Sequence, residues 1–275
     1  MNPVILLTGA TGFVGQQVLR SLSEKNVSIR LVLRDGSEIS EIYKNKIEKI
    51  IRTSDMFSES SSWWANACEN IDIAVHVAWY AEPGRYLQSS KNFQCLTGTL
   101  NLAKGAGKAG VRRFVGVGTC FEYDLKHNVL SVDTPIKPLT PYAGAKAATY
   151  FALSQLLPIH KIEFAWCRLF YLYGENEDSR RLVPYVHSRL SAGKEVELTS
   201  GNQIRDFMDV YDAGNCIADI ATNNIQGSVN ICSGTPITVR QLVEKIADKY
   251  GRRDLLKFGV RKDNLVDPPC IVGIK

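Results

Sequence analysis

The stretch Thr8-Gly9-Ala10-Thr11-Gly12-Phe13-Val14-Gly15 places a glycine at every third position. It follows the short apolar run Val4–Leu7, which predicts a buried strand, and it opens Gly15–Glu24, which predicts a helix. A turn this tight between strand and helix needs glycine, because a side chain would clash with the neighbouring backbone of the turn. Glycine also lets a group bound at the helix N-terminus come close to the backbone. The pyrophosphate of a dinucleotide binds in such a turn. The stretch therefore predicts a dinucleotide-binding turn, and the alternative is a plain strand–helix turn.

The sequence beyond this turn alternates between apolar runs and helical patterns. Further runs with the composition of buried strands are Ile29–Leu33, Ile71–Ala78, Phe114–Val117, Ile162–Leu169 and Ser228–Ile231. Between two of them, Leu96–Ala109 is rich in leucine, alanine and lysine with helical spacing. Apolar runs separated by helices are typical of parallel strands that are buried on both faces and joined by right-handed crossovers. The predicted fold is α/β, a doubly wound parallel sheet of the Rossmann type.

The character of the sequence changes after Gly174, where Glu175–Arg181 is charged and irregular. The elements expected beyond it include helices at Val183–Ala192 and Val239–Tyr250 and a short strand at Val196–Leu198. We expect residues 1–173 to form the dinucleotide-binding domain, with 209–232 returning to its sheet. Residues 174–275 are expected to form mainly a smaller C-terminal substrate-binding part.

The composition is that of an ordinary globular protein. Of 275 residues, 45% are hydrophobic and 22% are charged, which excludes a disordered or fibrous chain. The net charge is +5 without a stripe of lysines and arginines, so no nucleic-acid partner is expected. No apolar run approaches the roughly 20 residues that span a bilayer, so no membrane partner is expected. The seven cysteines lack a Cys-x-x-Cys pair, which indicates reduced thiols, no metal site and a cytoplasmic location.

Tyr142 and Lys146 form a candidate catalytic pair. They follow Thr140-Pro141, a sequence that starts helices well, because threonine caps the N-terminus and proline suits the first helical position. Residues four apart lie on one face of a helix, so the two side chains project together. A nearby ammonium stabilises a phenolate, and we expect Lys146 to bring the pKa of Tyr142 into the range useful for catalysis. The alternative is an ordinary surface tyrosine and lysine.

A polar segment closes the predicted strand at Phe114–Val117. It contains Thr119, followed by Cys120 and Phe121. Ligands of α/β proteins bind at the carboxyl ends of the strands, so Thr119 is placed to contact a substrate. The alternative is a threonine that only caps the strand.

The glycine spacing, the Tyr142–Lys146 pair and Thr119 together resemble the short-chain dehydrogenase/reductase superfamily. The resemblance is to its extended branch of NAD(P)-dependent nucleotide-sugar epimerases, dehydratases and reductases. Other segments that match motifs of this branch are Thr119 with Tyr123, His76-Val77-Ala78-Trp79, Cys167–Gly174 and Gln203–Phe207. His76 is expected to be structural, without a role in proton transfer. The chain departs from the pattern at Trp79, at Tyr171 in place of asparagine, and at Cys95, also in place of asparagine.

The resemblance implies a role for each matching residue. The catalytic residues are Thr119, Tyr142 and Lys146. The residues that bind the cofactor are Thr8, Gly9, Thr11, Gly12, Phe13, Val14, Gly15, Arg34, Asp55, Met56, Ala78, Tyr142 and Lys146. Those that bind a nucleotide-sugar substrate are Thr119, Cys120, Tyr142, Tyr171 and Arg205, with Arg205 on the diphosphate. A homodimer packed through the helices Leu96–Ala109 and Pro141–Leu157 would fit the branch.

Arg34 favours NADP(H) as the cofactor, with NAD(H) as the alternative. A member specific for NAD carries an acidic residue at the end of the second strand, which binds the ribose 2′-hydroxyl. Arg34 occupies that place, where a guanidinium pairs with a 2′-phosphate. Asp35, one residue later, is a competing candidate.

The residues after Thr119 favour one reaction within the branch. The 4,6-dehydratases that the chain resembles place an Asp-Glu pair there, whereas this chain has Cys120 and Phe121. Glu122 comes one position late and is expected to point away if the segment is extended. We therefore expect NADPH-dependent reduction of a 4-keto-6-deoxy nucleotide sugar to a deoxyhexose nucleotide, for surface polysaccharide or glycoside biosynthesis. The alternatives are a 4-epimerase or 4,6-dehydratase with retained NAD and, more distantly, a non-catalytic NAD(P)-sensing protein.

Overall fold

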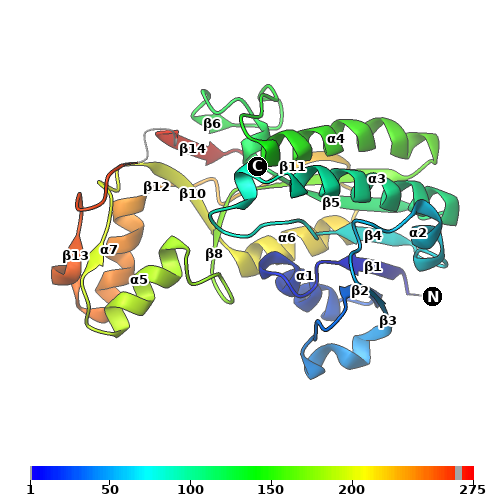
Figure 1. Ribbon diagram of the computed structural model, residues 1–275, viewed down its shortest axis with the longest axis horizontal. Coiled ribbons are helices and arrows are strands. Elements are labelled where there is room, and N and C mark those ends of the chain that lie inside the picture. Colours follow the sequence, from blue (N-terminus) through cyan, green and yellow to red (C-terminus); the bar gives the residue numbers. More distant parts are fainter. Residues whose placement is uncertain (1, 264–267) are drawn as a thin grey trace.

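A parallel sheet of seven strands forms the centre of the protein (Figure 1). We describe residues 2–263 and 268–275 of a computed structural model. The strands lie in the order β11-β7-β5-β4-β1-β2-β3, and every neighbouring pair is parallel. Their bounds are β1 (Val4–Thr8), β2 (Ser28–Arg34), β3 (Ile47–Thr53), β4 (Ile73–His76), β5 (Arg113–Thr119), β7 (Glu163–Leu169) and β11 (Gly227–Ile231). The predicted doubly wound α/β fold is confirmed, although β4 is shorter than the apolar run that predicted it.

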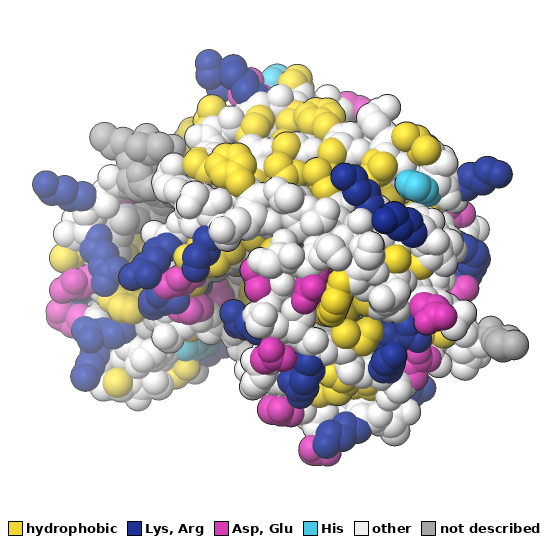
Figure 2. Space-filling view, turned by 45° about the vertical axis from the view of Figure 1, so that its right-hand side comes forward, with side chains coloured by type: hydrophobic (Ala, Val, Ile, Leu, Met, Phe, Trp, Pro, Cys, Tyr) yellow, Lys and Arg dark blue, Asp and Glu magenta, His cyan; other side chains and the backbone are white. Residues whose placement is uncertain are grey.

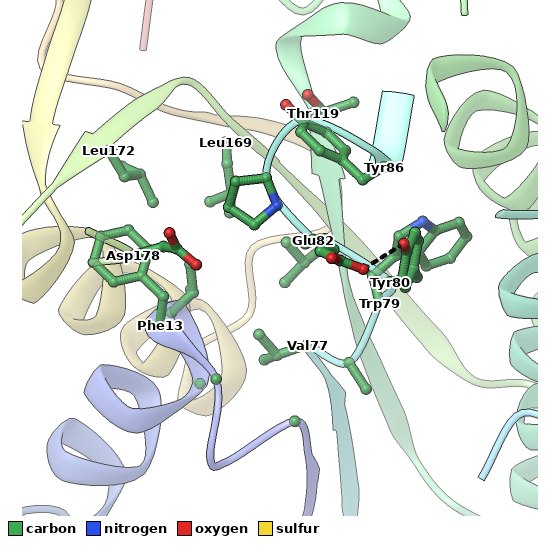
Figure 3. A pocket seen from close by; sticks show the side chains of 18 of the residues that line it. Phe13, Val77, Trp79, Tyr80, Glu82, Tyr86, Thr119, Leu169, Leu172 and Asp178 are labelled. Carbon is green, nitrogen blue, oxygen red and sulfur yellow. Dashed lines mark hydrogen bonds between the residues drawn. The ribbon is translucent and has the colours of Figure 1, made fainter. Parts of the chain in front are cut away.

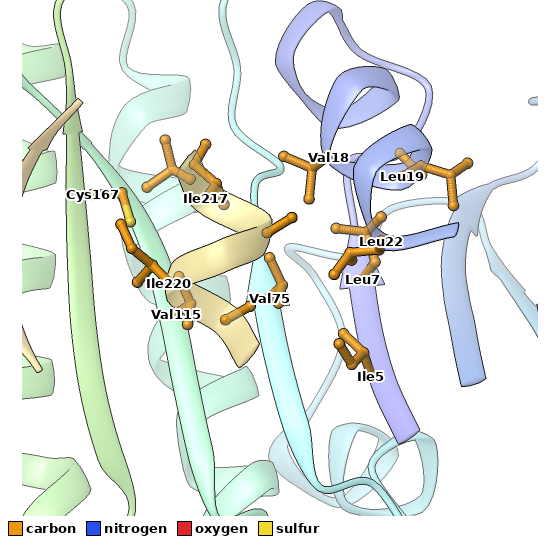
Figure 4. Close-up of a cluster of buried hydrophobic side chains, with 14 of the residues drawn as sticks. Ile5, Leu7, Val18, Leu19, Leu22, Val75, Val115, Cys167, Ile217 and Ile220 are labelled. Carbon is orange, nitrogen blue, oxygen red and sulfur yellow. The ribbon is translucent and has the colours of Figure 1, made fainter. Parts of the chain in front are cut away.

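Helices cover both faces of this sheet. One face carries α1 (Phe13–Ser23) and α6 (Val210–Thr222), and the other carries α2 (Ser61–Ala67), α3 (Lys91–Ala109) and α4 (Pro141–Ile159). Side chains of β1 alternate between the two layers. Ile5 and Leu7 pack with α1 and α6 (Figure 4), whereas Leu6 packs against the opposite helices. Burial on both faces explains why β1 is apolar at each of these positions.

The turn between β1 and α1 depends on glycine, as expected. Gly9 has a φ of +78°, in the left-handed region that side chains disfavour. At Gly15, a Cβ would lie only 1.9 Å from the carbonyl oxygen of Gly9. Helix α1 has Gly12 as its N-cap, with no side chain bonded to its first N–H groups. The helix therefore presents bare backbone donors at the carboxyl edge of the sheet.

The later part of the chain forms a smaller unit with its own apolar cluster. Its elements are α5 (Leu182–Ser191), α7 (Val239–Tyr250), β9 (Val196–Glu197) and β13 (Leu256–Lys257). A second sheet has the order β12-β10-β14-β6, from Pro236–Thr238, Ile204–Asp209, Cys270–Gly273 and Val129–Leu130. Strand β8 (Tyr171–Tyr173) joins it through β10. Within the residues described, no helix combines the length and apolar character needed to cross a membrane.

The chain passes between the two units more than once. From β10 it enters α6 and then β11, which pairs with β7 in the main sheet. Strand β8 precedes Gly174 in sequence but belongs to the second sheet. The carboxyl edge of the main sheet thus faces strands and loops from the later part of the chain.

Candidate functional site

A cleft of about 1270 Å³ lies at the carboxyl edge of the main sheet, between the two units. Figure 3 shows part of its wall, with Phe13 on one side and Trp79, Tyr86 and Thr119 on the other. The cleft brings together every residue that the sequence assigned to catalysis, cofactor or substrate, except Thr8. Segments far apart in the sequence therefore meet where the fold predicts a ligand.

Thr8 lies behind the cleft and is fully buried. Its hydroxyl is 2.8 Å from Nδ1 of His76, whose Nε2 is 2.9 Å from the hydroxyl of Thr99. Because Thr99 donates its own proton to the carbonyl of Cys95, it accepts from His76 Nε2, which leaves Nδ1 to accept from Thr8. Burial lowers the pKa of His76 to about 3, so the ring is neutral. Both nitrogens are engaged inside the protein, as a structural histidine requires.

The first half of the cleft fits a dinucleotide. Gly9 and Gly15 leave a cradle that a Cβ would fill, in front of the bare N–H groups of α1. Arg34 lines the cleft from the end of β2, whereas Asp35 does not. Asp55 is exposed, and its carboxylate accepts from the N–H of Phe57 at 3.0 Å and the hydroxyl of Ser58 at 2.7 Å. The charges and shape of these residues suit a pyrophosphate with a nucleoside on each side.

Thr119 is held by a single turn of 3-10 helix, not by extended backbone. This turn, Cys120–Glu122, brings the carboxylate of Glu122 back to accept the N–H of Thr119 at 2.8 Å. The hydroxyl oxygen of Thr119 accepts from the N–H of Phe121 at 3.3 Å, and the same side chain is hydrogen-bonded to Tyr142. The segment after Thr119 is therefore not extended, contrary to what the expectation for Glu122 assumed. Glu122 still points away from the cleft, because the turn aims it beneath Thr119.

Glu122 belongs to a buried polar cluster under Thr119. Its carboxylate accepts from Nε of Arg168 at 2.7 Å and from Nε1 of Trp166 at 3.1 Å. Glu122 and Arg168 are 0% and 1% exposed. Burial raises the pKa of Glu122, and the Arg168 guanidinium opposes that shift. Gly118 makes room for the cluster, since a Cβ there would lie 2.4 Å from the carboxylate.

Tyr142 and Lys146 lie on one face of α4, whose N-cap is Thr140 with Pro141 next to it, as the sequence predicted. The expectation that Lys146 lowers the pKa of Tyr142 is wrong. Burial and the nearby ring of Tyr86 raise the pKa of Tyr142, while a hydrogen bond with Thr119 opposes them. Burial also lowers the pKa of Lys146 to about 7. For both groups burial is the largest cause of the shift, because desolvation disfavours the charged form of each.

Two aromatic side chains next to this pair were missed as site residues. Trp79, which the sequence flagged only as a departure, covers Nζ of Lys146 at 3.8 Å from the ring centroid. Tyr86 packs edge-on against Tyr142, with 4.8 Å between ring centroids. Tyr86 begins a short 3-10 turn, Tyr86–Gln88, in the loop between β4 and α3, and a turn this short has no periodicity to signal which side chains point inward.

The charged loop after Gly174 also contributes side chains that the sequence did not single out. Glu177 lines the cleft, and its Oε2 is buried without a hydrogen-bond partner among the residues described. Burial raises the pKa of Glu177 to about 7. The neighbouring Asn176 donates to the side chain of Gln16 on α1 at 2.9 Å, so the loop is tied to the dinucleotide half.

The second half of the cleft holds the residues that the sequence assigned to substrate. Arg205 on β10 is 3% exposed, and its guanidinium lies 5.2 Å from the ring of Tyr171. Nη1 of Arg205 donates to the carbonyl of Ile204 at 2.9 Å. Cys120 is buried at the same wall, and burial raises the pKa of its thiol. The cleft thus has a cationic group on the side opposite the glycine turn.

Comparison with known proteins agrees with this geometry. The family model described as "NAD dependent epimerase/dehydratase family" matches residues 5–232. The chain is 25% identical to dTDP-6-deoxy-L-talose 4-dehydrogenase (NAD(+)) of Aggregatibacter actinomycetemcomitans, over 98% of this chain and 99% of that protein.

Solved structures show the same fold. The UDP-N-acetylglucosamine 4-epimerase from Methanobrevibacter ruminantium M1 superposes with a TM-score of 0.86 at 18% identity, over 99% of this chain and 89% of that one. DesIV, a dTDP-glucose 4,6-dehydratase from Streptomyces venezuelae with NAD bound, gives 0.82 at 20% identity, over 98% and 88%. Together with the family match, which spans most of the sequence, they show that the chain is an enzyme of the NAD dependent epimerase/dehydratase family, within the extended short-chain dehydrogenases.

Proposed function

We propose that this enzyme uses NADPH to reduce the ketone of a 4-keto-6-deoxy nucleotide sugar, giving a deoxyhexose nucleotide for surface polysaccharide or glycoside biosynthesis. The observation that carries the proposal is the chemistry beside Thr119. Cys120 and Phe121 supply no carboxylate, and Glu122 is buried against Arg168, outside the cleft. A dehydration that needs a carboxyl acid and base at these positions has no such groups there.

The catalytic side chains suit proton donation to a ketone oxygen. A bound nicotinamide dinucleotide supplies a hydride. Tyr142 donates its phenolic proton to the same carbonyl, so one hydride and one proton convert the ketone into an alcohol. The raised pKa of Tyr142 keeps the phenol protonated, the form that reduction requires. Thr119 orients the carbonyl oxygen through its hydroxyl, beside the phenol of Tyr142 to which it is hydrogen-bonded, and Lys146 stabilises the phenolate that remains.

The relative from Aggregatibacter supports oxidation and reduction at C4. Its name describes a 4-dehydrogenase of a dTDP-6-deoxy sugar, and the reverse of such a reaction is reduction of a 4-ketone. That name also specifies NAD(+), so our preference for NADPH rests on Arg34 of this chain.

We assign the substrate mainly to residues 174–275 and the dinucleotide to residues 1–173 with 209–232. Arg205 would hold the nucleotide diphosphate, since a guanidinium pairs with phosphate oxygens in two places at once. Its burial at the cleft wall, on the side opposite the glycine turn, supports that role. Arg205→Ala should raise the KM of the sugar substrate about ten- to hundredfold and leave NADPH affinity unchanged.

We also propose a homodimer through α3 and α4. Phe93 on α3 is 54% exposed, and Phe151 and Ile159 on α4 are 52% and 76% exposed. Figure 2 shows hydrophobic side chains gathered across the upper part of the surface, where Figure 1 places these helices. Sedimentation should give twice the 30.6 kDa of one chain, and Phe151→Glu with Ile159→Glu should give the monomer. A monomeric wild type would refute the dimer.

The experiment that tests the function supplies NADPH with TDP-, CDP- and GDP-linked 4-keto-6-deoxy sugars and follows the reduced nicotinamide by absorbance. Oxidation of one NADPH per 4-hydroxy product is expected. Tyr142→Phe should bind NADPH normally and lose turnover by about a hundredfold or more. Conversion of an ordinary nucleotide hexose to its 4-epimer or 4-keto-6-deoxy form without loss of NADPH would instead establish the epimerase or dehydratase.

A further inference from the structure

The loop between β4 and α3 places one aromatic ring against each member of the catalytic pair. Trp79 lies over the ammonium of Lys146, and Tyr86 lies edge-on to the ring of Tyr142. Both aromatic residues line the cleft (Figure 3). Both rings come from the same loop. A residue that holds this loop in place therefore also holds the contacts of Trp79 with Lys146 and of Tyr86 with Tyr142.

Asn92, in the first turn of α3, makes the bonds that fix the loop. Its Oδ1 accepts from Nε1 of Trp79 at 2.9 Å. Its Nδ2 donates to the carbonyls of Tyr86 at 2.6 Å and Ser89 at 2.8 Å. The orientation of the amide is unambiguous, because indole Nε1 only donates and carbonyl oxygens only accept. Asn92 is 0% exposed, and both ends of its amide are used.

The contact of Trp79 with Lys146 restricts the lysine to one position. Nζ donates to the carbonyl of Val117 at 2.6 Å on one side and meets the indole face on the other. An ammonium over the face of an indole is attracted by the π-electrons of the ring, and the attraction is stronger where water is excluded. The other titratable groups that interact with Lys146 are Glu122 from below, the thiol of Cys95 from α3 and the buried imidazole of His76 from β4. Within the part of the chain that the structure describes, Trp79 is the one residue of this loop that contacts Nζ of Lys146.

We propose that Asn92 is a positioning residue for the reaction, which holds Trp79 on Lys146 and Tyr86 on Tyr142. The inference rests on the proposed roles of Tyr142 and Lys146. Asn92 does not itself line the cleft, so it acts through the two rings. Small displacements of proton-transfer groups cost rate steeply, while ligand contacts elsewhere in the cleft are unaffected. Loss of Asn92 should therefore lower kcat and leave KM nearly unchanged.

Asn101 supplies a matched control on the same helix. Its Nδ2 donates to the carbonyl of Glu59 at 3.1 Å, and its side chain is outside the cleft. Asn101→Ala removes an asparagine-to-backbone bond from α3 without touching the loop. Asn92→Ala is compared with it in steady-state kinetics and in acrylamide quenching of Trp79. The signal of Trp79 is obtained by subtracting the emission of matched proteins carrying Trp79→Phe.

In Asn92→Ala, kcat should fall about ten- to hundredfold, with both KM values within about threefold of wild type. Trp79 should become more accessible to acrylamide, without ligand present. Asn101→Ala should resemble wild type in both measurements. Trp79→Phe keeps an aromatic ring but loses the hydrogen bond to Asn92, so its kcat should also fall. This variant provides the test if Asn92→Ala does not fold.

The inference fails if Asn92→Ala keeps wild-type kcat, if Asn101→Ala loses as much, or if Trp79 remains equally shielded. Where Asn92→Ala does not fold, normal kcat in Trp79→Phe overturns it. Tyr142→Phe separates this outcome from failure of the proposed function. If Tyr142→Phe is inactive while Asn92→Ala is normal, only the role of Asn92 is wrong. If Tyr142→Phe keeps turnover, the proposed function itself is wrong.

Discussion

Arg34 is the residue on which the proposed preference for NADPH rests. Its guanidinium lines the cleft and has no ion-pair partner in residues 2–263 and 268–275. We expect wild type to bind NADPH more tightly than NADH. Arg34→Ala should weaken NADPH about tenfold or more and leave NADH unchanged, because only NADPH carries the 2′-phosphate. Tryptophan fluorescence titration measures both affinities.

The control for Arg34 is Arg52→Ala, on the neighbouring strand β3. Arg52 is exposed, pairs with Glu38 at 3.3 Å and lies outside the cleft. It should not change either affinity. Wild type that binds NADH as tightly as NADPH would refute the role of Arg34.

Lys146 predicts a pH dependence of the free enzyme. Its pKa is lowered to about 7 by burial, although Glu122 and Cys95 oppose the shift. A lysine is charged below its pKa, so kcat/KM for the cofactor should fall as the pH rises through about 7. Lys146→Arg stays charged throughout and should lose this fall, at a lower overall rate. The same fall in both proteins would show that another group causes it.

The raised pKa of Glu177 predicts that this residue makes the folded protein less stable as the pH rises, whereas most carboxylates have the opposite effect. Its pKa is raised from 4.5 to about 7, so the folded protein favours the protonated form. The stabilisation is complete below pH 4.5 and is lost as the pH rises to about 7. Because Glu177 is only half-buried, solvent screening reduces the effect to about 1 kcal/mol.

Glu177→Gln should therefore unfold about 2–4 °C above wild type at pH 8 and at nearly the same temperature at pH 4.5. Glu175→Gln, an exposed neighbour on the same loop, is the control and should not change Tm. Equal Tm values for wild type and Glu177→Gln at pH 8 would contradict the raised pKa. Thermal unfolding followed by circular dichroism is sufficient.

At the scale of elements, the pairing of the 3-10 turn after β5 with β7 is the most sensitive contact under the site. Glu122 and Arg168 are both buried, so removing one charge leaves the other unpaired. Arg168→Met should lower the free energy of unfolding by about 3–5 kcal/mol. Adding Glu122→Gln should recover much of that loss, because no buried charge then remains.

Chemical denaturation of the single and double variants measures this coupling. The exposed pair Arg180–Asp178, at 2.8 Å, provides the comparison. Arg180→Met should cost less than about 1 kcal/mol. If Arg168→Met lowers the free energy of unfolding by an equally small amount, Glu122 and Arg168 are not coupled.

Long elements with strong local signals were predictable from the sequence, whereas short ones were not. Strand β1 is apolar on both faces, and α4 announces its start with Thr140-Pro141. Strands of two to four residues, such as β6 and β14, are too short to show a period. The turn Cys120–Glu122 was misjudged because its shape comes from a buried partner, Arg168, far away in the sequence.

The same distinction applies to the site. Residues at strand ends and helix starts, such as Thr119 and Tyr142, follow from the positions of those elements. Trp79, Tyr86 and Glu177 lie in loops, and only tertiary packing turns them into the cleft. Their pKa values and those of their neighbours depend on burial, which local sequence does not specify.

At the scale of the whole molecule, the cleft is where the two units meet. The larger unit presents the glycine turn and the side chains of Thr119, Tyr142 and Lys146 from its carboxyl edge. The smaller one adds Arg205 from β10 across the cleft. In the function we propose, this arrangement holds a dinucleotide and a second phosphorylated ligand with their reacting ends together.

The most direct test of the proposed reduction follows the transferred hydrogen. The enzyme is given NADPH deuterated on the transferred position of the nicotinamide, with its 4-keto-6-deoxy nucleotide sugar, and the product is examined by NMR and mass spectrometry. We predict one deuterium on C4 of the product for each NADPH oxidised. A product without deuterium at C4, formed while NADPH remains unconsumed, would contradict reduction and indicate chemistry with a retained, internally recycled NAD.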